Sequence, residues 1–320
     1  MFRRTFIAVL ACAASSFGAH AQEAGYPVKP IKIIVGYTPG GSNDVVARII
    51  AKRLQESLGQ PVVVENRPST GAIVGAVVTA KAPPDGYTLM IGASGPVVIN
   101  PATYQKLPYS PQKDFTPISL VATFPLIVSV KADTRLNSIG DLVKYTKENP
   151  QGSNYSSSAS TFQLATELLK ERTGIVAEHV PYKGSADSMQ AVAGGQVTFS
   201  MLDPGPAAGA IKGNLLRALA VTSDKRMAAY PNVPTLKEQG VDLQIKFWTG
   251  LFAPAGTPAP IVDLLERETS KAVAHPETVK TMEQLGLEPA SSTSKAFAQQ
   301  IDQEIKSWTQ LAHEKNIKSD

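Results

Sequence analysis

The sequence predicts an α/β protein of two lobes, each a mostly parallel sheet covered by helices. Short β-branched runs alternate with amphipathic helical patterns, which is typical of parallel strands packed between helices. This alternation begins near residue 31 and begins again near residue 160, which indicates two lobes in one chain. The length agrees, because 320 residues are enough for two domains.

The first series of elements opens with a β-branched strand at residues 31–35 and a turn-like stretch that reaches Gly41. A helix is predicted next, because apolar residues recur at intervals of four from Val46 to Leu58 and Gly59 follows. The rest of this series comprises a strand at 62–64, a helix of small residues at 71–80, a turn at 83–86 and a strand at 87–91.

The second series opens with a helix at residues 160–172. It continues with strands at 175–180, 197–202 and 216–221 and a short helix at 185–193. Two extended apolar segments, 120–130 and 245–252, are predicted to cross between the lobes as paired strands. The predicted division is therefore residues 22–124 plus 246–320 for the first lobe and 125–245 for the second. Pro258 is predicted to open a helix at about its first turn, and an apolar stripe from Phe297 to Leu311 predicts a long final helix.

The N-terminal residues have the pattern of a secretory signal peptide. Arg3 and Arg4 precede a short apolar run at 6–14, and small residues follow where a signal peptidase cleaves. We expect cleavage after Ala21, so that residues 1–21 are removed together with Cys12, the only cysteine. The apolar run is far shorter than the ~20 residues that span a bilayer. The alternatives are an uncleaved anchor, or a lipoprotein acylated at Cys12.

Composition and motifs exclude several classes of function. The formal net charge of +4 reflects nearly equal numbers of basic and acidic residues, whereas nucleic-acid binding proteins normally have clustered Lys and Arg. His179, His275 and His313 have no metal-ligand spacing around them, and no nucleotide-binding glycine motif follows a strand. We therefore predict no catalytic residue, no metal and no cofactor, and assign structural roles to these histidines.

The first candidate binding segment is YTPGGSND, residues 37–44. Gly40 and Gly41 permit backbone conformations that direct N–H groups inward, and Ser42 or Asn43 can cap the following helix. Unpaired N–H groups at a helix N-terminus favour an anion such as a carboxylate. The alternative is a plain glycine turn followed by an N-cap.

The second candidate segment is SNYSSSAST, residues 153–161, predicted to be a loop before a helix. Ser160 and Gln163 have the spacing of a capping box, and the preceding serine hydroxyls can donate and accept without adding charge. Ligands of open α/β sheets bind beyond the carboxyl ends of the strands, so two facing lobes would bring both segments into one cleft. The alternative is a flexible serine-rich linker.

Six motifs occur in a fixed order along the chain. They are YTPGGSNDVVAR (37–48), ENRPSTGAIVGA (65–76), APPDGYTLMIG (82–92), VPYKGSADSMQAVAGGQV (180–197), LRALAVTSDKR (216–226) and WTGLFAPAGTPAPIV (248–262). In these motifs and their order the chain resembles the Bug family, the periplasmic receptors of tripartite tricarboxylate transporters. The resemblance covers essentially the whole chain after the signal peptide.

The resemblance implies a Venus-flytrap fold, that is, a two-lobed periplasmic-binding-protein fold that closes about a hinge on a ligand in the interlobe cleft. It implies a periplasmic, non-catalytic receptor that binds a dicarboxylic or tricarboxylic acid, an acidic amino acid or an aromatic acid. Integral-membrane transporter subunits are the expected protein partners of a monomeric receptor. The implied ligand-binding residues are Tyr37, Gly40, Gly41, Ser42, Asn43, Ser94, Ser157, Ser158, Ala159, Ser160, Thr161 and Asp203.

Two departures from the family pattern leave the ligand open. Many relatives have a glycine-rich loop and His-Leu where this chain has SSSAST and Gln163-Leu164. Ser69 and Thr70 replace small residues in the segment NRPSTGA. Two other functions stay open at this point: a ligand sensor for a signalling receptor, and an enzyme of the same architecture, since fold does not fix function.

Overall fold

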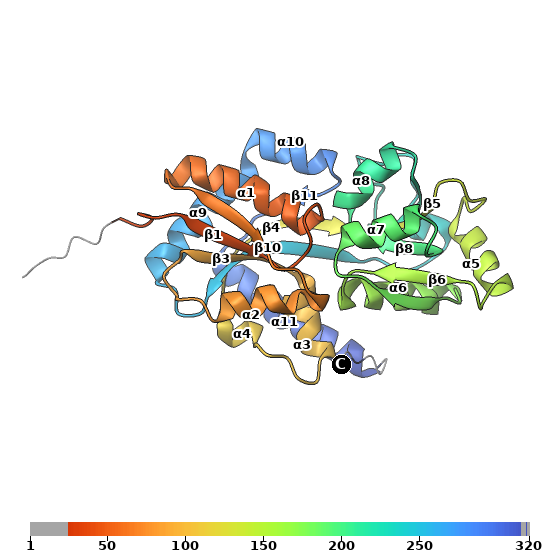
Figure 1. Cartoon of the computed structure of the whole chain (residues 1–320), viewed down its shortest axis with the longest axis horizontal. Helices are drawn as coiled ribbons and strands as arrows, with labels where there is room; N and C mark the ends of the chain where they lie inside the picture. The colour runs from red at the N-terminus through yellow and green to blue at the C-terminus, as the bar shows by residue number, and fades with distance from the viewer. Residues whose placement is uncertain (1–24, 315–317, 319–320) are drawn as a thin grey trace, which may run out of the picture.

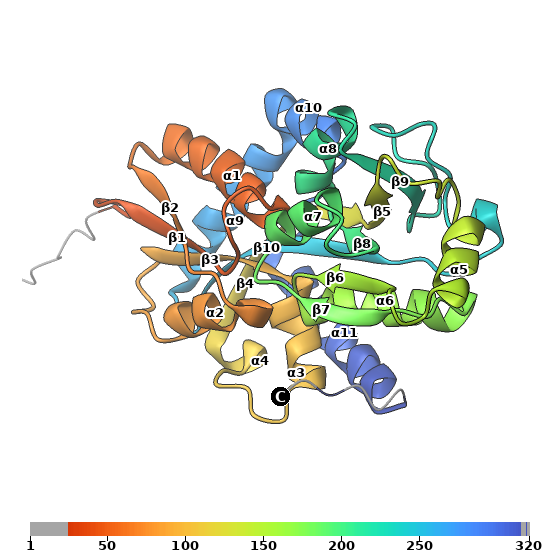
Figure 2. The ribbon, with the colours of Figure 1, turned by 45° about the vertical axis from the view of Figure 1, so that its right-hand side comes forward.

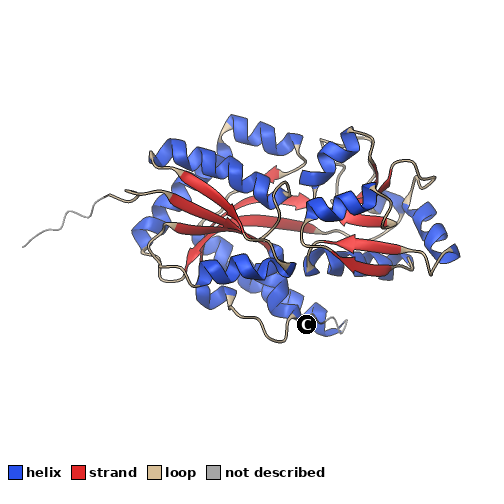
Figure 3. Ribbon diagram, in the orientation of Figure 1, coloured by secondary structure: helices blue, strands red, loops and turns tan. Residues whose placement is uncertain are grey.

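The computed structural model describes residues 25–314 and Lys318, and the strands in this range form two sheets (Figure 1). One sheet has six strands in the order β11-β4-β10-β3-β1-β2, and the other has five in the order β7-β6-β8-β5-β9. Helices pack around both sheets, which confirms the predicted α/β class (Figure 3). The predicted signal peptide, Cys12 and the cleavage site lie outside the described residues.

The first lobe, as we call it, is the six-stranded sheet with its helices. Its strands are β1 (Ile31–Val35), β2 (Val62–Asn66), β3 (Thr88–Ala93), β4 (Phe115–Pro125), β10 (Lys246–Pro254) and β11 (Glu288–Pro289). Its helices are α1 (Ser42–Leu58), η1 (Thr70–Ala72), α2 (Ile73–Ala80), η2 (Gly95–Ile99), α3 (Asn100–Thr103), α4 (Pro111–Asp114), α9 (Ala259–Ala274), α10 (Pro276–Gln284) and α11 (Ser294–Glu314).

The second lobe is the five-stranded sheet with its helices. Its strands are β5 (Ile127–Lys131), β6 (Asn154–Ser157), β7 (Glu178–Pro181), β8 (Phe199–Leu202) and β9 (Leu216–Val221). Its helices are α5 (Ile139–Glu148), α6 (Ser160–Thr173), α7 (Ser185–Ala193), α8 (Pro204–Lys212) and η3 (Lys237–Gln239). The predicted domain boundaries at residues 124 and 245 stay a prediction.

Helix α1 illustrates how sequence pattern becomes structure. Val46, Ile50 and Leu54 recur on one face and are fully buried against the first sheet. Gly59 ends the helix with a φ of +68°, a left-handed conformation that favours glycine, and its N–H donates to the carbonyl of Gln55. The apolar stripe accounts for the face that α1 buries, and Gly59 accounts for its C-terminal end.

Strand directions are more mixed than the sequence suggested. Strand β1 is parallel to β2 and β3, and β6 is parallel to β7 and β8. In contrast, β10 is antiparallel to β3 and β4, and β5 is antiparallel to β8 and β9. The reason is connectivity: β4 carries the chain out of the first lobe and β10 carries it back, so the two run in opposite directions.

Segment 120–130 is not one crossover strand. It divides at Leu126 into β4 of the first sheet and β5 of the second. The side chain of Thr222 links this point to the segment that leads back to the first lobe. Its Oγ1 accepts the N–H of Leu126 at 2.8 Å, and the same hydroxyl donates to the carbonyl of Ile245 at 2.6 Å. One buried hydroxyl therefore links the two segments that connect the lobes.

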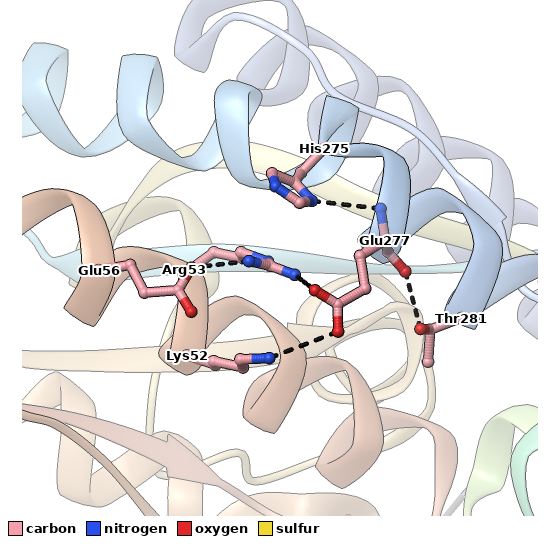
Figure 4. Close-up of polar contacts among 6 residues, drawn as sticks. All are labelled: Lys52, Arg53, Glu56, His275, Glu277 and Thr281. Carbon is pink, nitrogen blue, oxygen red and sulfur yellow. Dashed lines mark hydrogen bonds and ion pairs between the residues drawn. The ribbon is translucent and has the colours of Figure 1, made fainter.

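Helix α10, which the sequence analysis did not predict, is attached to α1 by ion pairs (Figure 4). Glu277 pairs with Arg53 and Lys52 of α1, and His275 Nδ1 accepts the N–H of Glu277 at the start of α10. His275 thus has the structural role expected of it. None of the helices in the described part of the chain is long and apolar enough to cross a membrane.

Candidate functional site between the lobes

The loop between β1 and α1 is held in shape by Asp44. Its Oδ2 accepts the N–H of Gly40 at 2.9 Å, and its Oδ1 accepts bonds from Arg48 and Asn66, each at 2.9 Å. Burial alone would raise the pKa of Asp44, but these hydrogen bonds outweigh it and the pKa is lowered. Gly40 has a φ of +86°, which a glycine adopts without strain. The loop is therefore a defined structure rather than a flexible turn.

Neither Ser42 nor Asn43 caps α1, so that prediction was wrong. Gly41 precedes the helix without a side-chain cap. Ser42 Oγ instead accepts the N–H of Gly205 at 2.9 Å, and Asn43 Oδ1 accepts the hydroxyl of Thr249 at 2.6 Å. Both side chains are buried. Their hydrogen-bond partners lie on α8 and β10, so they do not bond to the N–H groups of α1.

Asp203 reaches the N-terminus of α1 from the other lobe. It lies between β8 and α8, is 1% exposed, and its Oδ2 accepts the N–H of Ser42 at 3.0 Å. Its Oδ1 has no hydrogen-bond partner among the described residues. A carboxylate of the protein thus accepts one of the helix N–H groups that the sequence analysis offered to a ligand, and this hydrogen bond joins the two lobes. Figure 2 shows α7 and α8 of the second lobe beside α1 of the first.

Part of the predicted serine-rich loop, residues 154–157, is strand β6. Its serines are buried because they satisfy one another: Ser188 Oγ donates to Ser156 Oγ at 2.8 Å, and Ser200 Oγ donates to the carbonyl of Ser156 at 2.7 Å. Hydroxyls paired in this way cost little to bury, so a run of serines can form an inner strand. The loop prediction failed because composition does not show such pairing.

Ser157 and Ser158 bond within the second lobe. Ser157 Oγ lies 2.7 Å from His179 Nε2, and Ser158 Oγ lies 3.0 Å from Ser185 Oγ. Both serines are nearly fully buried. These two predicted residues therefore hold the binding segment against β7 and α7 in this structure.

Helix α6 begins differently from the predicted capping box. Ala159 precedes the helix without a side-chain cap, and Ser160, its first residue, donates its hydroxyl to Asn100 Oδ1 of the first lobe at 3.1 Å. The next residue, Thr161, is 3% exposed, and its Oγ1 has no hydrogen-bond partner among the described residues. A buried donor without a partner therefore stands in the first turn of α6.

Glycines allow the two lobes to approach closely. A Cβ added to Gly95 would lie 2.7 Å from Thr161 Oγ1, and one added to Gly205 would lie 2.6 Å from Ser42 Oγ. A Cβ on Gly184 would collide with the side chain of Thr38. Larger side chains at these positions would hold the lobes apart.

The segments from both lobes enclose a small cavity of about 10 Å³. A volume of this size admits at most about one water molecule, so a larger ligand enters only when the lobes separate. Five predicted residues line it: Tyr37, Asn43, Ser94, Ala159 and Thr161. Six lining residues were missed: Ala93, Gly95, Phe124, Phe162, Phe247 and Trp248. Gly40, Gly41, Ser42, Ser157, Ser158, Ser160 and Asp203 are not among the lining residues.

Two of the missed residues come from the crossover strands. Phe124 of β4 and Phe247 of β10 are directly paired across the sheet, where the chain passes between the lobes. The sequence placed both within the predicted crossover segments, and an aromatic residue in each was the available signal. Trp248 is held by Ser94, whose Oγ accepts its backbone N–H at 3.0 Å.

Electrostatically, the lining offers neutral donors. Burial, followed by the nearby Tyr109 and Asp203, raises the pKa of Tyr37, so its phenol stays protonated. None of the eleven lining residues, all in the described range, carries a charge. Neutral donors at a helix N-terminus suit an anion. Elsewhere, the described residues contain no group of three or more His, Cys, Asp or Glu that could hold a metal ion.

Two larger hollows, of about 540 and 590 Å³, occur elsewhere in the described part of the molecule. One lies at the far end of the second lobe, lined in part by Lys131 and Tyr145, and the other lies beside the crossover, lined in part by Arg226 and Leu287. Neither contains a residue predicted to bind a ligand. The small cavity is the better candidate because predicted binding residues of both lobes and an unpaired buried hydroxyl meet there.

Known proteins are similar to this chain in sequence and in fold. Residues 46–317 match the family described as "Tripartite tricarboxylate transporter family receptor". BugT of Bordetella pertussis is 35% identical over 297 residues, which are 92% of this chain and 91% of BugT. A solved structure of an R. palustris protein with adipate is 33% identical, with a TM-score of 0.87 over 90% of this chain and 97% of that one. MatC from Rhodopseudomonas palustris with bound malate is 29% identical, with a TM-score of 0.83 over 89% of this chain and 99% of MatC.

Proposed function

The chain belongs to the tripartite tricarboxylate transporter receptor family, and from this membership we propose that it closes on a small carboxylate and delivers it to the membrane subunits of such a transporter. The resemblance to the Bug proteins is confirmed, and this is a family of periplasmic solute-binding receptors and not of enzymes. The chain is therefore a periplasmic solute-binding receptor. The class of its carboxylate and the delivery step are the proposal.

The observation that carries this proposal is the unpaired hydroxyl of Thr161. Leaving a buried hydrogen-bond donor without a partner costs roughly 1–3 kcal/mol. An unpaired hydroxyl in a cavity therefore points to a ligand atom as its partner. Thr161 stands in the first turn of a fourteen-residue helix, where N–H groups add a partial positive charge. A ligand carboxylate placed there accepts from both the hydroxyl and the helix N-terminus.

We assign the predicted site residues by their position. Tyr37 and Asn43 face the carboxylate from the first lobe, and Ala159 and Thr161 face it from the second. The remaining predicted residues shape or join these segments: Gly40, Gly41, Ser42, Ser94, Ser157, Ser158, Ser160 and Asp203. The ligands named for the two solved relatives, adipate and malate, are carboxylates and support this class.

Replacing Thr161 with Val tests the assignment. Val has nearly the same shape and no hydroxyl, so Thr161→Val removes an unpaired buried group and leaves the stability of the free protein unchanged or slightly higher. The affinity for the carboxylate should fall roughly 10- to 150-fold, the equivalent of about 1.5–3 kcal/mol for one hydrogen bond to a charged group. Calorimetry and chemical denaturation measure the two effects.

Thr166 supplies the matched control on the same helix. It is fully buried, and its hydroxyl donates to the carbonyl of Phe162 at 2.7 Å. Thr166→Val should lower stability by about 1 kcal/mol and leave affinity unchanged. The acid and its amide are compared in parallel: equal affinity of the wild type for both would contradict an anion site.

We further propose that the chain is exported with cleavage after Ala21 and acts as a monomer. The pattern of residues 1–21 supports the first statement. Intact-mass measurement of the periplasmic protein would detect a chain that begins at Gln22. An acylated chain that retains Cys12 would contradict it.

A further inference from the structure

We propose that Asp203 is the positioning residue that holds the lobes closed, because its negative charge lies where the N-termini of α1 and α8 meet. Asp203 and Ser42 form two crossed hydrogen bonds between these helices, which we call the latch. The latch sets the balance between open and closed lobes and does not depend on which carboxylate binds.

Each of the two helices supplies a hydrogen-bond partner to the N-terminus of the other. Asp203 is the N-cap residue of α8 but makes no side-chain bond to that helix, and its Oδ2 accepts the N–H of Ser42 at 3.0 Å. Ser42 is the first residue of α1, and its Oγ accepts the N–H of Gly205 at 2.9 Å. Both bonds join one lobe to the other, so both exist only while the lobes are closed.

The prolines at the start of α8 explain how Asp203 can exchange partners. Pro204 and Pro206 have no N–H, so Gly205 has the single N–H among the first three residues of the helix. An N-cap aspartate ordinarily accepts from the second or third residue, but Ser42 Oγ already accepts the N–H of Gly205 here. When the lobes part, this N–H becomes available to Asp203. The carboxylate therefore has a partner on its own helix in the open form and on α1 in the closed form.

The charge of Asp203 favours the closed form because a second helix end lies beside it there. The N-termini of α1, with 17 residues, and α8, with nine, carry partial positive charges that repel each other when they meet alone. Asp203 is 1% exposed, and its Oδ1 has no hydrogen-bond partner among the described residues. The latch holds if the attraction to the second helix end exceeds the cost of burying this carboxylate.

A latch of this kind changes ligand affinity without contacting the ligand. Asp203 is not among the residues that line the small cavity between the lobes. For a ligand that is held by the closed form, the apparent dissociation constant rises as the closed fraction falls. Loss of the latch should therefore weaken all ligands of the cleft by the same factor, whereas loss of a ligand contact weakens each ligand according to its own groups.

The distance between two spin labels tests the latch without any ligand. Cys12 is the only cysteine, so the processed protein can be labelled at Ser57→Cys near the end of α1 and Lys212→Cys at the end of α8, both exposed. Because the helices meet at their N-termini, parting of the lobes lengthens the distance between these labels. Asp203→Asn keeps an oxygen that can accept the N–H of Ser42 but removes the charge. We expect the ratio of closed to open protein to fall about 5- to 30-fold, the effect of a charge at a partly buried helix end.

Asp141→Asn is the matched control. Asp141 stands in the first turn of α5 and accepts the N–H of Asn137 at 2.9 Å, within the second lobe. This variant should give the label distances of the wild type. Ser42→Ala removes only the bond to Gly205 and should lower the ratio about 2- to 10-fold. In calorimetry on the unlabelled processed protein, Asp203→Asn should weaken the binding of adipate and of malate by the same factor.

The outcomes separate the latch from the proposed carboxylate function. Equal label distances in the wild type and Asp203→Asn overturn the latch, whether or not either acid binds. Unequal losses for adipate and malate show that Asp203 contacts the ligand, and they overturn it too. If Asp203→Asn does not fold, wild-type distances in Ser42→Ala overturn the latch. If neither acid binds the wild type but Asp203→Asn still lengthens the label distance, the carboxylate function falls and the latch stands.

Discussion

At the scale of single residues, His179 connects the binding segment to charged groups on α6. Its Nε2 lies 2.7 Å from Ser157 Oγ, and its ring lies 5.1 Å from that of Tyr155. Tyr155 donates its hydroxyl to Glu167, which is also paired with Lys170. Burial lowers the pKa of His179, Glu167 opposes this shift, and Lys170 adds to it.

This lowered pKa predicts a pH dependence of stability. The unfolded chain protonates His179 near its ordinary pKa of about 6.5, whereas the folded protein does so only at lower pH. Stability contributed by the neutral imidazole is therefore fully present above pH ~6.5 and is lost as the pH falls toward the folded pKa, by less than about 1.4 kcal/mol per pH unit.

Denaturant unfolding of the wild type and His179→Gln at pH 7.5 and 5.5 measures the effect. The variant should lose less stability than the wild type over this interval. His313→Gln, at the exposed end of α11, is the control and should follow the wild type. Identical pH profiles of stability for His179→Gln and the wild type would show that His179 does not cause this pH dependence.

Residue-level roles were the least predictable from sequence. Ser42 and Ser160 were correctly placed at helix starts, but their hydroxyls bond to Gly205 and Asn100, which lie in the opposite lobes. A capping pattern counts only neighbours along the chain, and these partners are more than fifty residues away. The unpaired hydroxyl of Thr161 likewise follows from packing that no local pattern encodes.

At the scale of elements, the start of α8 controls how closely the lobes approach. Gly205 is the second residue of α8, and a Cβ there would lie 2.9 Å from the backbone N and Cα of Ser42 on α1. Gly205→Ala should therefore resist closure, and it brings no gain in helix stability, because Gly205 lies in the first turn and directly precedes Pro206. We expect ligand affinity to fall by about 1–3 kcal/mol, the typical cost of overpacking.

Gly209 on the same helix is the matched control, because a Cβ added to it meets nothing within 4 Å. Gly209→Ala, in the middle of α8, should gain about 0.5–1 kcal/mol of helix stability and bind the ligand like the wild type. Small-angle scattering should show that added ligand compacts the wild type and Gly209→Ala but compacts Gly205→Ala less. Equal compaction and affinity in all three proteins would mean that this contact does not limit closure.

Elements with a strong apolar period were predicted well, and those defined by long-range partners were not. Residues 185–193 and 216–221 match α7 and β9 as predicted. The strand predicted at 175–180 is β7 at Glu178–Pro181, because its pairing with β6 selects those residues. Helices α5, α8 and α10 were missed; α8 opens with Pro-Gly-Pro and α10 with proline, which look like turns without the packing around them.

At the scale of the whole molecule, the two-lobed α/β architecture followed from the repeated alternation of strands and helices and from the family motifs. The cavity did not follow, because it depends on how deeply two lobes interlock. Phe124, Phe162 and Phe247 are far apart in sequence and meet only after the crossovers are in place. Convergence of this kind is a property of tertiary packing and not of any sequence window.

The position of β10 also determines the order in which the chain can fold. The second sheet is built from residues 127–221, one continuous stretch, whereas β10 is the inner strand that joins β4 to β3 in the first sheet. Until residues 246–254 pair with β3, the sheet formed by β1, β2 and β3 has an unpaired edge at β3. Pairing over so long a separation in sequence is slow. We therefore expect amides of β6 and β8 to gain protection from hydrogen exchange before those of β3 during refolding. Earlier protection of β3 would show that the first three strands form a stable unit without β10.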